Sequence, residues 1–204
     1  MEDRLKSILD SAIGLFNRYG IRSVTVDDIC RELGMSKKTI YLYVSSKEDL
    51  VRAMLASRIQ SIHEIFAGST GPGMNAIDTL ATFGKLMGDY LKNLKMNLSL
   101  DYDLKKYFPS VYREYMDQRN QIIHQRLAEN IRQGIEQELY RAELNADLLA
   151  DLFMIKMENL TEADSATEAA YSSKKMYKVM IENHIRGLVT KKGVKYFEKN
   201  ILGK

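Results

Sequence analysis

Basic and hydroxyl side chains gather in a short stretch near the N-terminus of the chain. They are Thr25, Ser36, Lys37, Lys38, Thr39, Tyr41, Tyr43 and Lys47. Ammonium and hydroxyl groups of this kind hydrogen-bond to the phosphate oxygens and the base edges of DNA. We therefore treat these residues as candidate nucleic-acid contacts.

Some of these residues also have a purely structural interpretation. Lys37 and Lys38 could stand at an ordinary solvated helix start, but a cation there opposes the helix dipole at a cost of roughly a few tenths of a kcal/mol. An anionic partner at the helix N-terminus would offset that cost. Tyr41 could instead pack in the core, whereas we expect Tyr43 to be exposed.

The local sequence predicts two short helices that position these side chains. Thr25 and Asp28 form a capping box for a helix that ends at Gly34, and Ser36 can cap a second helix over 37–44. A longer amphipathic helix, over 5–19, comes before them. Two short helices joined by a glycine-containing turn are typical of a helix-turn-helix, whose second helix enters the DNA major groove.

The rest of the chain also has helical patterns. Ser45 and Glu48 form a capping box for a fourth helix, which reaches the glycine-rich linker 68–73. Further helices are predicted over 74–98, before Pro109, over 110–136, after Asn145 and over 165–188. Since no period-2 alternation occurs, we predict an all-α fold. It comprises an N-terminal three-helix DNA-binding domain, 1–47, and a larger helical dimerisation and ligand domain, 48–204.

Three runs of residues resemble the TetR family of transcriptional regulators. They are Thr25-Val-Asp-Asp-Ile-Cys, Leu33-Gly-Met-Ser-Lys-Lys-Thr-Ile-Tyr-Leu-Tyr and Ser46-Lys-Glu-Asp-Leu. Near the end of the chain, Ile185-Arg-Gly-Leu-Val-Thr-Lys-Lys-Gly is similar to the last dimer helix of the family. Val44 stands where the family commonly has Phe, and Cys30 where Ala is usual; both look like core substitutions that leave the DNA face unchanged.

The resemblance implies a bacterial, ligand-responsive repressor that binds a palindromic, double-stranded operator as a homodimer. On the matching positions, Thr25, Tyr43 and Lys47 would contact phosphates, while Lys37, Lys38 and Thr39 would face base edges. A small-molecule effector of unknown identity would bind the larger domain. The resemblance implies no catalytic residue, metal ion or cofactor.

The middle of the chain is rich in methionine and aromatic residues, most of which would be core. A bundle lined by such side chains can also hold a mostly apolar ligand. The candidate ligand-binding residues are Phe83, Met87, Tyr90, Tyr107, Tyr112, Met116 and His124.

The helices after Asn145 and over 165–188 have a wider apolar surface than one core-facing side requires. Pairing with the same helices of a second copy would bury the surplus in a four-helix bundle. The predicted interface residues are Leu149, Leu152, Phe153, Tyr177, Met180, Ile181, His184, Ile185 and Leu188. The alternative is that they form a monomeric core.

Composition limits the function classes further. The chain has 204 residues, 45% hydrophobic and 28% charged, with a net charge of +3, which favours a folded protein over a disordered one. Because Cys30 is the only cysteine, no internal disulfide can form, and we interpret Cys30 as a buried small hydrophobe rather than a redox sensor. The chain has neither a secretory signal nor an 18-residue apolar run, so we expect a cytoplasmic protein without membrane contact.

Two other functions stay open at this point. The chain could be a helical small-molecule-binding protein or enzyme with a vestigial DNA-binding motif. No glycine-rich phosphate loop, nucleophile elbow or metal motif supports an enzyme, and His63, His124 and His184 are far apart in the sequence. It could also be a DNA-binding or partner-binding protein that takes no effector.

Overall fold

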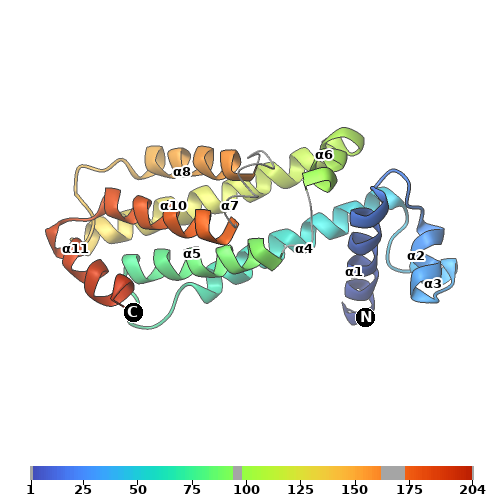
Figure 1. The fold of residues 1–204 in the computed structure, drawn as a ribbon, viewed down its shortest axis with the longest axis horizontal. Helices are drawn as coiled ribbons and strands as arrows, with labels where there is room; N and C mark the ends of the chain where they lie inside the picture. Colours follow the sequence, from blue (N-terminus) through green and yellow to red (C-terminus); the bar gives the residue numbers. More distant parts are fainter. Residues whose placement is uncertain (1, 94–97, 162–172, 204) are drawn as a thin grey trace. The chain divides into compact units, whose positions relative to one another are not determined.

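The computed structural model describes residues 2–93, 98–161 and 173–203 (Figure 1). The helices are α1 (Glu2–Tyr19), α2 (Val26–Leu33), α3 (Lys37–Ile40), α4 (Lys47–Gly68), α5 (Ala76–Asn93), α6 (Leu98–Tyr107), α7 (Pro109–Glu136), α8 (Ala146–Thr161), α10 (Ser173–Leu188), α11 (Lys191–Phe197) and the short π-helix η1 (Glu198–Leu202). In these ranges the only β pairing is an isolated bridge between Tyr140 and Val189. The predicted all-α fold is confirmed. None of the described helices combines the length and apolar character that a membrane crossing requires.

The chain divides into two compact units. The first contains residues 1–61 and 94–118, and the second contains 62–93 and 119–204. The core of the first unit joins α1, α2 and the start of α4 to Leu100, Leu104 and Val111 from α6 and α7. The N-terminal unit is therefore larger than the 1–47 segment drawn from the sequence, because apolar residues remote in the sequence complete its core.

Local signals determine how α2 and α3 begin and end. Thr25 caps α2, and the capping box with Asp28 is present. Gly34 ends the helix at φ 61°, a left-handed conformation that glycine adopts at little steric cost. Ser36 then caps α3 by accepting a hydrogen bond from the Thr39 amide. These caps confirm the two-helix layout expected from the sequence.

Two element boundaries differ from the prediction. The expected helix over 37–44 is regular only to Ile40, after which the Leu42 and Tyr43 amides donate to carbonyls three residues back, at 3.3 and 2.9 Å. At α4, the Asp49 amide donates to Oγ of Ser46 at 3.0 Å, so the cap lies one residue later than the predicted Ser45.

The second unit contains the long helices of the C-terminal part. The Leu148 amide donates to Oδ1 of Asn145 at 3.1 Å, which confirms the predicted cap of α8. The predicted capping box of Ser165 and Glu168 lies outside the described residues. Helices α11 and η1 were not expected from the sequence; Thr190 caps α11.

Helices α5 and α10 of the second unit lie side by side (Figure 1). A Cβ atom added to Gly84 in α5 would lie 2.8 Å from Cγ1 of Ile181 in α10. The two helices thus leave little room for a side chain at position 84, and Gly84 and Ile181 both line the groove described below.

Candidate nucleic-acid interface and ligand groove

The side chain of Thr25 is occupied by its capping role, although the residue is exposed. Its hydroxyl donates to Oδ2 of Asp28 at 2.7 Å, and its Oγ1 accepts from the Asp28 amide at 3.3 Å. Hydrogen bonds from Thr25 lower the pKa of the Asp28 carboxyl. Thr25 thus stabilises the start of α2, and its hydroxyl would have to release Asp28 before it could donate to a phosphate.

Ser36 and Thr39 form a small hydroxyl cluster at the start of α3. Oγ of Ser36 accepts from the Thr39 amide at 3.1 Å, and the two hydroxyl oxygens lie 2.8 Å apart. Ser36 is exposed and Thr39 is half-buried. The cluster therefore helps to hold the helix start that carries the two lysines.

The two lysines of α3 differ in their surroundings. Nζ of Lys37 lies 2.8 Å from Oδ1 of Asp27 in α2, and the hydrogen bond to Asp27 raises the pKa of the Lys37 ammonium. Both side chains of this pair are more than half exposed, so solvent screens the attraction and the pair contributes little to folding. Lys38 is exposed as well. A DNA phosphate could therefore replace Asp27 at small cost.

The turn that follows α3 presents two large side chains to solvent. Tyr41 is 45% exposed and Leu42 is 76% exposed. Tyr43 is half-buried and packs against the core of the first unit. The prediction that Tyr43 would be exposed, while Tyr41 could pack in the core, was therefore wrong. Leu42 was missed, although its place between two tyrosines, one helical turn after Lys38, could have suggested it. We call residues 36–44 the recognition segment.

Lys47 is less available than its sequence position suggests. Its ammonium donates to the carbonyl of Arg22 at 3.4 Å and lies 5.9 Å from the ring centre of Phe16. Partial burial lowers its pKa. Arg22 is itself exposed, with its guanidinium 5.8 Å from the ring of Tyr107, and is a further cation of this region that the sequence reasoning did not single out.

The predicted ligand-binding residues come from both compact units. Tyr107, Tyr112 and Met116 belong to the first unit, whereas Phe83, Met87, Tyr90 and His124 belong to the second. Tyr107 and Tyr112 pack against the core of the first unit, and Phe83 stacks on Phe66 at 4.6 Å between ring centres. Nε2 of His124 lies 3.2 Å from Oδ1 of Asp151 at a partly exposed site. The sequence pattern thus grouped residues of two separate units, of which Phe83 and Met87 are buried.

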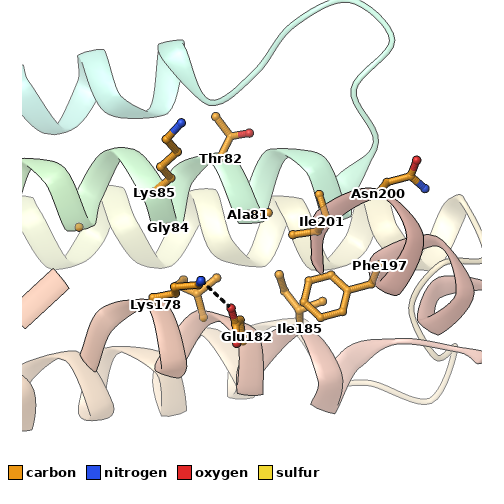
Figure 2. A pocket seen from close by; sticks show the side chains of 12 residues that line it. Ala81, Thr82, Gly84, Lys85, Lys178, Glu182, Ile185, Phe197, Asn200 and Ile201 are labelled. Carbon is orange, nitrogen blue, oxygen red and sulfur yellow. Dashed lines mark ion pairs between the residues drawn. The ribbon is translucent and has the colours of Figure 1, made fainter. Parts of the chain in front are cut away.

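In the second unit, a groove of about 460 Å³ lies between α5, α10 and the C-terminal helices α11 and η1 (Figure 2). We call it the α5–α10 groove. It is lined by Ala81, Thr82, Gly84, Lys85, Gly88, Lys178, Ile181, Glu182, Ile185, Phe197, Asn200 and Ile201. Its walls are mostly apolar, and Nζ of Lys178 lies 3.7 Å from Oε1 of Glu182. None of the seven predicted ligand residues is among those that line it.

A second cavity of about 370 Å³ in the same unit has a more polar lining that includes His63, Ser69, Thr79 and Arg126. Phe83 contributes to it, as the only one of the predicted ligand residues that does. Its lining combines the stacked rings of Phe66 and Phe83 with these polar side chains.

Most of the predicted dimer residues are covered by their own chain. Phe153, Tyr177, Ile181, His184, Ile185 and Leu188 are buried, so they are not available to a second copy. Leu149 and Met180 are half-buried, and Leu152 is 45% exposed. The helices α8 and α10 expose other apolar side chains: Leu148, Ile155 and Val179. We call Leu148, Leu152, Ile155 and Val179 the α8–α10 apolar stripe.

His184 is a polar group in this apolar core. It lies 4.9 Å from the Phe153 ring, and its Nε2 is buried with no hydrogen-bond partner in the part of the chain that the structure describes. Burial, with a smaller effect of Lys156, lowers the pKa of the His184 imidazole from 6.5 to about 4. The side chain is therefore neutral at physiological pH.

The chain is similar to bacterial regulatory proteins. A family model described as "Bacterial regulatory proteins, tetR family" matches residues 8–54, which contain α2 and α3. The chain is 22% identical over 150 residues to the HTH-type transcriptional repressor KstR2 of Mycobacterium tuberculosis, over 73% of this chain and 75% of that one. It is 24% identical over 104 residues to the tetracycline repressor protein class D of Escherichia coli, over 50% and 48% of the two chains.

Solved structures extend the likeness to both units. A TetR transcriptional regulator from Chloroflexus aurantiacus aligns over 93% of this chain and 98% of its own, with a TM-score of 0.71 and 21% identity. At that identity the likeness establishes the fold. The similar curated proteins are regulators of transcription rather than enzymes.

Proposed function

We propose that the chain, which is a DNA-binding transcriptional regulator of the TetR family, represses transcription by binding a palindromic operator as a homodimer. The observation that carries this proposal is the exposed recognition segment, where Lys37 and Lys38 follow the capped start of α3. Occupation of an operator at a promoter would block transcription there. In this role the protein is not an enzyme and acts in the cytoplasm.

The recognition segment supplies the proposed base contacts. Lys37, Lys38 and Thr39 face base edges in the major groove, and Tyr41 and Ser36 lie beside them. Thr25, Tyr43 and Lys47 contact phosphates and fix the register of the protein on the duplex. The half-buried Lys47 and Tyr43 would do so through their exposed parts, and Lys47 lies next to the exposed cation Arg22.

The homodimer is proposed to form through the α8–α10 apolar stripe. Leu148, Leu152 and Ile155 recur at spacings of four and three residues, which places them on one side of α8. A twofold pairing of this surface would be isologous, and it would match the symmetry of a palindromic operator. The buried side chains of α8 and α10 would then pack within their own chain beneath the interface and would not contact the second copy.

The effector is proposed to occupy the α5–α10 groove. The apolar walls suit a mostly apolar compound, and Lys85 at the lining could attract a negative charge on it, whereas Lys178 already pairs with Glu182. Binding would favour a dimer whose recognition segments are wrongly spaced for the operator. The effector can shift that equilibrium only by its difference in affinity for the two states.

Selection from a pool of randomised duplexes tests the proposed function. Purified protein would be incubated with the pool, and bound sequences would be recovered over several rounds. The proposal predicts a palindrome with half-sites about one helical turn apart. Recovery of no common sequence, with binding that depends on salt alone, would overturn it.

A further inference from the structure

Leu42 is unusual among the apolar side chains of this protein. It is 76% exposed, more than any other large hydrophobic residue in the part of the chain that the structure describes. A single exposed leucine is ordinary on a protein surface. Leu42 is informative because it stands within the recognition segment, one helical turn after the exposed Lys38.

The backbone around Leu42 holds its side chain outward. Ile40 and Val44, on either side of it, are 0% and 4% exposed and belong to the core of the first unit. The Leu42 amide donates to the carbonyl of Thr39 at 3.3 Å, and the Val44 amide donates to that of Ile40 at 3.1 Å. Turning Leu42 inward would displace one of these buried neighbours, so the exposed position is fixed before any partner binds.

The surroundings of Leu42 favour DNA over a protein as the partner of this side chain. Lys37 and Lys38 lie close in the sequence, and charged residues are depleted from the centre of protein interfaces. In the major groove the thymine 5-methyl is the one apolar group on a base edge, and apolar side chains contact it. A fixed leucine close in the sequence to two exposed lysines matches that chemistry.

We propose that Leu42 packs against a thymine 5-methyl group in each operator half-site and thereby selects thymine at that position. The inference rests on the proposed operator binding and adds to it a specificity determinant that makes no hydrogen bond. Cytosine lacks the methyl group, so it would be rejected at this position, whereas 5-methylcytosine would satisfy the apolar contact.

Methyl deletion from the DNA tests the inference. In the selected operator, each thymine would be replaced by deoxyuridine, one symmetry-related pair at a time, and the dissociation constant would be measured by fluorescence anisotropy. For the wild-type protein we expect one symmetry-related pair of thymines at which replacement weakens binding about fifteenfold. This loss corresponds to about fourfold for each half-site, the value of one buried methyl group. Leu42→Ala should bind the thymine and deoxyuridine duplexes equally at that pair.

Lys38→Ala is the matched control, because it alters the same segment and should keep the wild-type dependence on the methyl group. Circular dichroism melting would establish that Leu42→Ala remains folded, as its exposure predicts. The inference is overturned if no thymine replacement weakens DNA binding by the wild-type protein. It is also overturned if Leu42→Ala loses as much affinity on thymine replacement as the wild type does. Failure of the proposed function is a separate result, since no operator would then be recovered for the test.

Discussion

The ammonium of Lys37 and the carboxylate of Asp27 lie 2.8 Å apart and connect the start of α3 to the first turn of α2. The pair neutralises a cation on the surface that we propose binds phosphate or base edges. DNA binding must therefore compete with Asp27, whose negative charge also repels the duplex. We therefore expect Asp27 to lower the affinity of the recognition segment for DNA.

Substitution of Asp27 measures this competition. We expect Asp27→Asn to strengthen operator binding by roughly two- to fivefold near 0.1 M salt, because Lys37 is released and one repulsive charge is lost. Titration by anisotropy at several salt concentrations would measure the gain, which should shrink as salt rises. Asp10→Asn, an exposed position in α1, removes the same charge elsewhere and should have less effect. Weaker binding by Asp27→Asn would contradict this account.

The α8–α10 apolar stripe makes a prediction about assembly. Leu152 and Ile155 are 45% and 55% exposed, so charged replacements should fold but should oppose burial against a second copy. We expect Leu152→Glu with Ile155→Glu to sediment as a monomer at micromolar concentration, where the wild-type protein sediments as a dimer. Leu202→Glu, at an exposed apolar position in η1, serves as the control. A double variant that stays dimeric would place the interface elsewhere.

His184 predicts a specific dependence of stability on pH. The pKa of its imidazole is about 4 in the folded chain and 6.5 ordinarily, so the unfolded chain binds an extra proton between these values. Stability should therefore fall as pH decreases through this window, with a total contribution of up to roughly 3 kcal/mol. Urea unfolding of His184→Leu from pH 7 to pH 4 should show a shallower decline than the wild type.

The exposed His63 provides the comparison for that experiment. His63→Gln is the control, because it removes a histidine side chain at an exposed position. Parallel declines for the wild type and His184→Leu would mean that His184 does not titrate as its burial indicates.

Gly84 tests the packing beneath the α5–α10 groove. A Cβ at this position would lie 2.8 Å from Cγ1 and 2.9 Å from Cγ2 of Ile181, which are held in a packed side chain. Gly84→Ala should lower the free energy of unfolding by about 1 to 2 kcal/mol, despite the better helix propensity of alanine. Gly187→Ala in α10 meets no atom within 4 Å and should be neutral or slightly stabilising. Denaturant titration would measure the free energy of unfolding of both variants. Equal values for Gly84→Ala and Gly187→Ala would contradict the close packing at Gly84.

Local signals allowed the N-terminal motif to be predicted from the sequence. Thr25, Gly34 and Ser36 act on backbone groups within a few residues, and the structure has each in its expected capping place. The shift of the α4 cap from Ser45 to Ser46 shows the limit of that reasoning, because adjacent serines carry the same signal. The DNA contacts assigned to these residues stay predictions.

Sequence periodicity indicates that a side chain is apolar and lies on one helix face, but not whether its own chain or a second copy covers it. Tyr177 and Ile185 were assigned to a second copy, but α5 and α8 of their own chain bury them. Tyr107 was grouped with Phe83, although the two belong to different units. Leu42 was overlooked for a related reason, since its exposure follows from the packing of Ile40 and Val44. These assignments depend on contacts between segments distant in the sequence.

Stoichiometry on the selected operator tests the central claim most directly. The protein would be titrated against the full palindrome and against a duplex in which one half-site is scrambled, with sedimentation of the complex to count chains. We predict two chains on each full operator and an affinity at least about a hundredfold lower for the scrambled duplex, because one set of recognition contacts is lost. One chain per duplex, with equal affinity for both, would contradict a homodimer that reads two half-sites.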